Sequence, residues 1–156
     1  MVIIFEDHKL FLKKLLEAQV DFILVGGYAV NFYGYNRPTG DMDIWLKPSN
    51  DNREKLAILL EKENYSPGSV AQIRNADFTK HLAFHLGKEP FRIDFLTFIQ
   101  GVSFEEAKAQ QQLLPLEDKF VPVIHLHHLV ISKTNTDRFK DKADIEELQK
   151  IRGKKK

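Results

Sequence analysis

Residues 25–44 read VGGYAVNFYGYNRPTGDMDI, and they hold the densest group of chemically informative side chains in the chain. The Gly26-Gly27 pair follows a short apolar run over 22–25, a pattern that predicts a buried strand ending in a sharp turn. A short helix is expected next, over 28–35, and Pro38 prevents it from continuing. Glycine lets a backbone approach a ligand closely, and the start of a helix offers free N–H groups, so this turn is a candidate phosphate site.

Two carboxylates follow the turn on a second expected strand, over 41–46. Asp41 and Asp43 are two residues apart and therefore project from the same face of that strand, while Met42 and Ile44 project from the other face. Like charges this close repel each other unless a positive ion lies between them. Magnesium suits such a site, because it accepts one or two carboxylates and completes its shell with water and phosphate oxygens.

A third carboxylate, Asp94, lies on a later strand expected over 91–98. Phe91, Ile93 and Phe95 share one face of this strand, which places Asp94 on the opposite face. If this strand lies beside the 41–46 strand, three carboxylates converge and can hold two cations about 3.5–4 Å apart around a phosphoryl group. The alternative for Asp94 is an exposed strand residue paired with Arg92 or with a lysine on a neighbouring strand.

The rest of the chain predicts an α+β (or α/β) domain, a mixed β-sheet with flanking helices and two further helices at the C-terminus. We expect a helix around 11–17, a helix capped by Asn50 or Asp51, a hairpin of strands over 81–86 and 91–98, a loop and edge strand within 113–124, and helices around 125–134 and 140–152. A single domain is therefore expected over 1–150, with its core over 1–124, C-terminal helices over 125–150 and a basic tail over 151–156.

Composition excludes several classes of protein. Hydrophobic residues at 43% and charged residues at 29% are ordinary for a soluble domain, and the absence of cysteine excludes disulfides, thiolate metal sites and cysteine nucleophiles. A formal net charge of +1 argues against a broad nucleic-acid footprint. The chain has neither a signal-peptide pattern nor an apolar stretch long enough for a bilayer, so we expect no membrane partner and a cytoplasmic location.

The motif Arg37-Pro-Thr39-Gly-Asp41-Met-Asp43-Ile44, behind a Gly-Gly turn and ahead of a later strand Asp, resembles the nucleotidyltransferase superfamily that includes DNA polymerase beta. The likeness is strongest to its small bacterial branch, the lincosamide-type antibiotic nucleotidyltransferases and abortive-infection toxin nucleotidyltransferases. There, Leu129-Val-Ile-Ser-Lys133 and Arg138-Phe-Lys140-Asp141-Lys-Ala-Asp144-Ile145 also have counterparts. The resemblance covers roughly 20–150.

This resemblance implies transfer of a nucleoside monophosphate from a nucleoside triphosphate, with ATP the expected one, to a hydroxyl acceptor, with release of pyrophosphate. It implies Mg²⁺ or Mn²⁺ as cofactor, held by the catalytic carboxylates Asp41, Asp43 and Asp94, the last as second-site ligand or as general base. The nucleotide-binding positions that it implies are Gly26, Gly27, Tyr28, Arg37, Thr39 and Lys133. Tyr28 stands where many members carry a serine that touches phosphate.

Lys133 also has a reason of its own to lie near the cleft. Leu126, Leu129 and Val130 form the apolar face of the expected 125–134 helix, and Lys133 continues that face. A lysine at the end of an apolar stripe either extends to solvent or enters a polar cleft, and the resemblance implies the cleft. Asp141 shares the inward face of the last helix and is expected to pair with Lys133 or Arg138.

Rival functions remain open on the sequence alone. The main alternative is a catalytically silent nucleotide-binding or toxin–antitoxin-type regulatory module, and a weaker one is a glycosyltransferase, which also uses Asp-x-Asp with a metal. The acceptor can be a small molecule such as an antibiotic, a protein or an RNA, and a second subunit in a homodimer is expected to complete its site. The histidine run over 125–128 has the wrong spacing for zinc and is expected to be structural.

Overall fold

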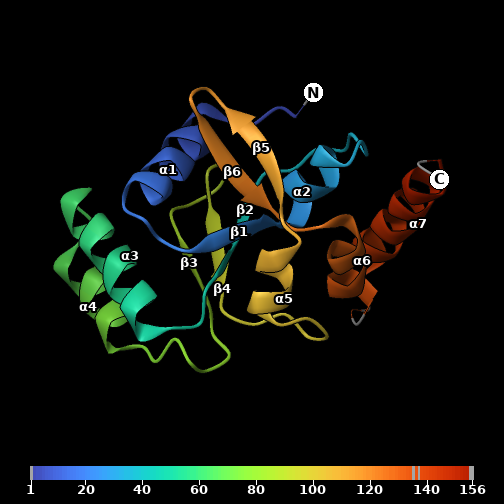
Figure 1. The fold of residues 1–156 in the computed structure, drawn as a ribbon. Helices are drawn as coiled ribbons and strands as arrows, with labels where there is room; N and C mark the ends of the chain where they lie inside the picture. Colours follow the sequence, from blue (N-terminus) through green and yellow to red (C-terminus); the bar gives the residue numbers. More distant parts are fainter. Residues whose placement is uncertain (1, 135, 137, 155–156) are drawn as a thin grey trace.

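The computed structural model describes residues 2–134, 136 and 138–154, and these form a single mixed sheet with helices packed around it (Figure 1). The described strands run in the order β3-β4-β2-β1-β6-β5 across the sheet. The strands are β1 Phe22–Val25, β2 Met42–Leu46, β3 Ala83–Leu86, β4 Ile93–Leu96, β5 Gln112–Leu116 and β6 Lys119–Val123. The helices are α1 Glu6–Glu17, α2 Gly26–Phe32, α3 Asn50–Lys62, α4 Pro67–Asn75, α5 Phe104–Ala109, α6 Leu126–Thr134 and α7 Phe139–Lys154.

The central strands β1, β2 and β4 contribute buried apolar side chains to the hydrophobic core. β1 and β2 are antiparallel, whereas β2 and β4 are parallel. Leu24 lies beside Ile44, and Ile44 beside Phe95, so these three apolar side chains share one face and are buried. The mixed sheet with flanking helices confirms the α+β fold class.

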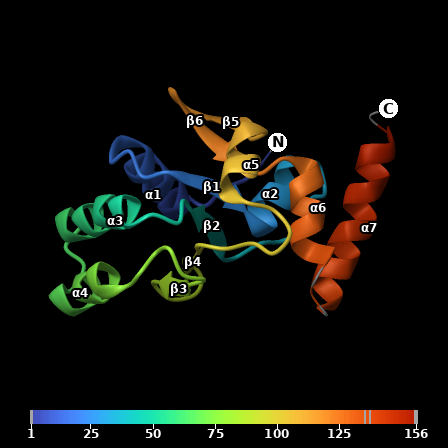
Figure 2. The ribbon, with the colours of Figure 1, turned by 60° about the horizontal axis from the view of Figure 1, so that its bottom comes forward.

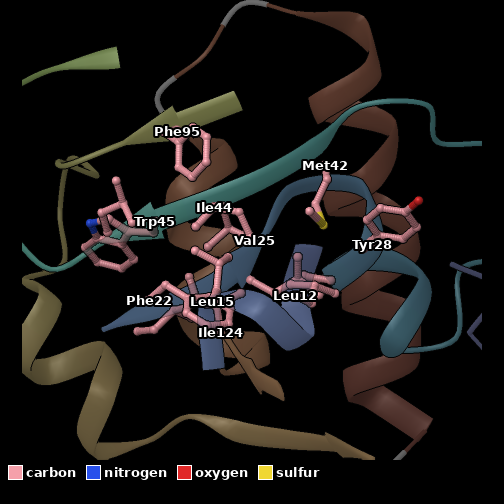
Figure 3. Close-up of a cluster of buried hydrophobic side chains, with 14 of the residues drawn as sticks. Leu12, Leu15, Phe22, Val25, Tyr28, Met42, Ile44, Trp45, Phe95 and Ile124 are labelled. Carbon is pink, nitrogen blue, oxygen red and sulfur yellow. The ribbon is translucent and has the colours of Figure 1, made fainter. Parts of the chain in front are cut away.

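Helix α1 covers this apolar face. Its buried residues include Phe11, Leu12 and Leu15, at the spacing of one helical stripe, and the Phe11 ring lies 6.1 Å from the Phe95 ring in an edge-to-face arrangement. Figure 3 shows this cluster, with α1 side chains beneath the strand that carries Met42 and Ile44. The opposite face of the sheet is covered in part by α5, where Phe104 packs edge-on against Trp45 at 5.4 Å.

Helix α3 begins one residue earlier than the sequence predicts. The N-cap is Ser49, whose side chain accepts a hydrogen bond from the Asn52 backbone N–H at 3.2 Å, so the expectation of Asn50 or Asp51 as cap is wrong. Both of those residues lie in the first turn, where Asp51 favours the positive end of the helix.

Two short helices, α4 and α5, escape the sequence analysis. α4 opens Pro67-Gly68-Ser69, residues that suggest a loop, although Ser66 caps it and Pro67 occupies its first turn. α5 has only six residues, but Ser103 and Glu106 form a reciprocal capping box that the sequence displays openly.

The 112–123 region forms a full hairpin of two strands rather than a loop and one edge strand. β5 lies at the edge of the sheet, and β6 lies between β5 and β1. β6 carries Pro122, which cannot donate to a sheet hydrogen bond, and this proline misled the prediction.

Helices α6 and α7 stand together at one end of the molecule, and the α3–α4 pair lies at the other (Figure 1 and Figure 2). Helices α6 and α7 confirm the two C-terminal helices that the sequence predicts. Within the part of the chain that the structure describes, no helix is both long and apolar enough to cross a bilayer.

Candidate active site

The strand register brings the predicted carboxylates together. Asp43 on β2 lies directly beside Asp94 on β4 and beside Val25 on β1, so their side chains share the face opposite α1. Asp41 immediately precedes β2, two residues before Asp43. All three carboxylates line one cleft.

The Gly26-Gly27 turn is shaped by close contact with side chains of the cleft. Gly26 has φ +67°, in the left-handed region, and a methyl group added to it would lie 2.7 Å from Cγ and 2.8 Å from Cβ of Asp43. A methyl group on Gly27 would lie 2.8 Å from Cβ of Thr39. Both glycines are therefore required by the packing of the backbone against Asp43 and Thr39.

The carboxylates are crowded and incompletely neutralised. The pKa of Asp43 is raised to about 6, first by burial and then by the neighbouring Asp94 charge, although the nearby Lys140 ammonium opposes both effects. Oδ1 of Asp41 is buried without a hydrogen-bond partner among the described residues. The pKa of Glu89 is also raised, first because it shares a hydrogen bond with the Asp41 carboxylate.

Asp94 is partly neutralised by its own strand. The guanidinium of Arg92 donates to Oδ1 of Asp94 at 2.9 Å, and both side chains are partly exposed. Asp94 is therefore paired with Arg92, as in the alternative interpretation, and it also lies beside Asp43.

A basic wall from α6 and α7 faces the carboxylates. It consists of Lys133 near the end of α6, Arg138 just before α7, and Lys140 in the first turn of α7, and all three line the cleft. Lys133 is buried, and its Nζ lies 3.1 Å from Oδ1 of Asp141 and 3.0 Å from Oδ2 of Asp144.

The two α7 carboxylates hold this wall in place. Asp141 has no exposed surface and accepts from Thr136 Oγ1 at 2.7 Å and from Arg138 Nε at 2.6 Å. Burial alone would raise the pKa of Asp141, but these hydrogen bonds and the Lys133 charge lower it to about 2. The pairing of Asp141 with both Lys133 and Arg138 confirms the prediction made for that helix face.

Arg37 also reaches the wall of the cleft, but its guanidinium is engaged by α7. Its Nε and Nη2 donate to the two oxygens of Asp144 at 2.7 and 2.8 Å, a bidentate pair. Arg37 Nη1 donates to the Pro38 carbonyl at 3.1 Å. The predicted nucleotide-binding arginine is therefore near the site and already partnered.

The cleft between the acidic and basic walls has a volume of about 470 Å³, within the range of small-molecule sites. It brings together every predicted site residue except Tyr28. The lining residues are Val25, Gly26, Gly27, Arg37, Thr39, Gly40, Asp41, Asp43, Glu89, Asp94, Leu96, Ile99, Ser132, Lys133, Arg138, Lys140 and Asp141.

The Tyr28 side chain lies outside the cleft, and the nucleotide-binding role expected at this position stays a prediction. It is 1% exposed and belongs to the buried cluster drawn in Figure 3. Its hydroxyl is hydrogen-bonded to Nδ1 of His8 on α1 at 2.7 Å. The Tyr28 ring also lies edge-to-face against the His8 ring, with ring centroids 5.6 Å apart, so the side chain packs α2 against α1.

Residues 4–156 match the family described as "Nucleotidyl transferase of unknown function (DUF2204)". The chain belongs to this family. Membership in a nucleotidyl transferase family agrees with the cleft, in which a glycine turn, strand carboxylates and a basic wall converge.

Solved structures show the same fold at low sequence identity. One is a lincomycin-bound crystal structure of the lincosamide antibiotic adenylyltransferase LnuA, with TM-score 0.56 and 17% identity over 95% of this chain and 98% of that one. Another is an antigenic nucleotidyltransferase-like protein from Paracoccidioides brasiliensis, with TM-score 0.52 and 12% identity over 92% of this chain and 72% of that one. No curated protein sequence matches this nucleotidyl transferase.

Several cleft residues of this nucleotidyl transferase were not selected by sequence reasoning as site residues. Glu89 lies in the expected turn of a hairpin, where an acidic residue carries no functional signal. Ser132 and Lys140 fall inside the motif that carries the resemblance, so their positions offered a signal that went unused.

A divalent cation fits the carboxylate wall if the carboxylates supply only part of its ligands. Among the described residues, no three His, Cys, Asp or Glu side chains form an arrangement that would by itself hold a metal ion. Magnesium in nucleotide enzymes needs only one or two carboxylates, with phosphate and water oxygens completing its shell. The unpartnered oxygen of Asp41 and the repulsion acting on Asp43 both favour a cation at this point.

Proposed function

We propose that this protein is a metal-dependent nucleotidyltransferase that moves a nucleoside monophosphate from a nucleoside triphosphate to a hydroxyl acceptor and releases pyrophosphate. The observation that carries the proposal is the cleft itself, in which Asp41, Asp43 and Asp94 face Lys133, Arg138 and Lys140. A polyanion that arrives with divalent cations is complementary to both walls.

Asp41 and Asp43 would hold Mg²⁺ or Mn²⁺, and Asp94 would either complete this site or take the proton of the acceptor hydroxyl. When bound, the metal would supply charge neutralisation on the α-phosphate and on the departing pyrophosphate. The raised pKa of Asp43, about 6, leaves it predominantly ionised at neutral pH, as metal ligation requires.

The other wall would hold the phosphates that leave. Lys133, Arg138 and Lys140 present the positive charge, and the Gly26-Gly27 backbone packs directly against Asp43 and Thr39 at the same edge of the cleft because neither glycine has a Cβ. Thr39 lies against Gly27 and adds a hydroxyl at the same edge. Catalysis would rest mainly on positioning and electrostatic stabilisation of the transition state.

ATP is the nucleotide we propose, and the acceptor is a hydroxyl on a small molecule, a protein or an RNA. The structural neighbour LnuA is described as a lincosamide adenylyltransferase with lincomycin bound, so lincosamides are a rational first class of small acceptor to screen. A homodimer would allow a second subunit to complete the acceptor side of the cleft.

Calorimetric titration with ATP and magnesium tests the proposal directly. The Asp41→Ala/Asp43→Ala variant is expected to lose magnesium-dependent binding of ATP, because both proposed metal ligands are gone. The matched control is Asp51→Ala/Asp118→Ala, which removes the same charge at two exposed positions outside the cleft and should bind like wild type. Unchanged binding in the Asp41/Asp43 variant would refute the proposed site.

Transfer is then separated from binding with ATP labelled at the α-phosphate. Incubation with lysate and with a panel of hydroxyl-bearing small molecules should give a labelled product in wild type and none in the double variant. Magnesium-dependent ATP binding with no transferred label across these acceptors would favour the catalytically silent regulatory module.

A further inference from the structure

Asp144 lies in the interior of the protein although it carries a charge. It belongs to α7, has no exposed surface, and makes a bidentate pair with Arg37 at 2.7 and 2.8 Å as well as an ion pair with Lys133 at 3.0 Å. It does not line the cleft itself. One buried carboxylate thus joins α6, α7 and the segment before β2.

The segment over 33–41 depends on such contacts for its shape. It has no helix or strand of its own between α2 and β2, and it ends at Asp41. Two residues anchor it: Tyr33 Oη donates to the Ile124 carbonyl at 2.6 Å, and Arg37 makes several bonds. The Arg37 backbone N–H donates to Asn31 Oδ1 at 3.3 Å, Nη1 donates to the Pro38 carbonyl at 3.1 Å, and the remaining guanidinium nitrogens bond Asp144. The same nitrogen Nη1 lies 3.5 Å from the point that a Cβ on Gly27 would occupy.

Helix α7 docks through buried charged groups as well as through apolar side chains such as Leu148 and Ile145. Of its described residues, the fully buried ones are Asp141, Asp144 and Leu148, each with no exposed surface. A carboxylate at this depth is stable only while its cationic partners remain in place. The Arg37–Asp144 pair therefore links the position of α7 to the conformation of the 33–41 segment.

We propose that Asp144 is a positioning residue that acts through Arg37 to fix the 33–41 segment, and with it Asp41, for binding of a metal–nucleoside triphosphate complex. This inference rests on the proposed function. In this arrangement Arg37 serves Asp144 and the loop, and the charge that meets the phosphates comes from Lys133, Arg138 and Lys140.

A positioning role for Asp144 and simple electrostatics predict opposite changes in triphosphate affinity when Asp144 is neutralised. Asp144→Asn removes a negative charge near a site for a polyanion, which by charge alone would strengthen triphosphate binding. If Asp144 positions the loop, the same change weakens binding, because Arg37 loses its bidentate partner and Asp41 is no longer held. Loss of a residue that orients a metal ligand lowers affinity by about tenfold to hundredfold.

The binding test uses α,β-methylene-ATP with magnesium, titrated by calorimetry into wild type, Asp144→Asn and Glu146→Gln. Glu146 is an exposed residue of α7 outside the Arg37 contacts, so its variant removes the same charge from the same helix. We expect weaker binding by about tenfold or more in Asp144→Asn, wild-type affinity in Glu146→Gln, and partial recovery in Asp144→Glu, which restores the carboxylate. Equal or tighter binding in Asp144→Asn would overturn the proposal.

A second measurement needs no nucleotide. Hydrogen–deuterium exchange of the free proteins should show faster exchange in peptides covering 33–41 for Asp144→Asn and for Arg37→Lys, with β1 and α3 unchanged. Arg37→Lys keeps the charge beside Asp144 but loses the two parallel hydrogen bonds, so it is the milder variant. Unchanged exchange in 33–41, or global unfolding of both variants, would overturn the positioning role.

The two measurements separate this inference from the function on which it rests. If wild type fails to bind the magnesium–analogue complex, the proposed function fails, and exchange in 33–41 alone decides whether Asp144 holds the segment. If wild type binds and neither binding nor exchange changes in Asp144→Asn, the function stands and the positioning role is rejected.

Discussion

Replacement of Gly26 by alanine tests the geometry of the cleft at its tightest point. The new methyl group would lie 2.7 Å from Cγ and 2.8 Å from Cβ of Asp43, nearer than carbon atoms approach in folded proteins, and it would overlap the carboxylate. The backbone at φ +67° also disfavours any side chain. Gly26→Ala is thus strained for two independent reasons.

Each reason has a typical magnitude. A left-handed conformation costs an L-residue about 1–2 kcal/mol, and an added methyl in a packed site costs about 1–3 kcal/mol, so the free energy of unfolding should fall by about 2–5 kcal/mol. For a chain of 156 residues this corresponds to a Tm lower by about 4–20 °C. Displacement of Asp43 should also weaken magnesium–ATP binding by about tenfold or more.

The assay is thermal unfolding by circular dichroism together with calorimetric titration of magnesium–ATP. Gly68→Ala is the matched control, because a methyl group there meets nothing within 4 Å and Gly68 lies in the first turn of α4. That control should keep wild-type binding and gain up to about 1 kcal/mol of stability. A Gly26→Ala protein as stable as Gly68→Ala, with unchanged affinity, would refute the close approach of Gly26 to Asp43.

Three further predictions follow from the charges of the cleft. The pKa of Asp43 is about 6 in the folded protein against 3.8 when unperturbed, so the free energy of unfolding falls as pH rises between these values. Asp43→Asn should therefore raise the Tm at pH 7 in the absence of metal and abolish magnesium–ATP binding. An unchanged or lower Tm would contradict the crowding of the carboxylates. The pKa of Asp141 is lowered from 3.8 to about 2, so its contribution to folding stability is complete above pH 4 and is lost as pH falls through this range. The Tm of wild type should therefore drop more steeply than that of Asp141→Asn between pH 4 and 2. Parallel plots of Tm against pH for the two proteins would count against the buried network. Arg92→Gln frees Asp94 and should tighten Mn²⁺ binding by about twofold to fivefold, whereas weaker or unchanged Mn²⁺ binding would place Asp94 outside the metal site.

The carboxylates illustrate what could be predicted from sequence. The period of two along a strand places Asp41 and Asp43 on one face and Met42 and Ile44 on the other, and the observed burial of both apolar residues agrees. The same rule orients Asp94 but says nothing of its neighbour. Only the parallel pairing of β2 with β4 brings Asp94 beside Asp43.

Short helices and proline-containing strands differ in how clearly their sequences indicate them. The capping box of α5 was present in the sequence and overlooked, whereas the Pro-Gly-Ser start of α4 is indistinguishable from a loop without its packing against α3. Pro122 suggested an irregular segment, although β6 tolerates it beside β5 and β1.

The sequence by itself determined the fold class, the glycine turn and the face on which each strand carboxylate lies, because backbone preferences and hydrophobic periodicity act over a few neighbouring residues. The tertiary structure decided which charges meet. Tyr28 turned into the core to bond His8, and Arg37 paired with an aspartate 107 residues away rather than standing free on the cleft wall. Contacts over such separations depend on how α1, α6 and α7 pack against the sheet, and no local pattern encodes that packing.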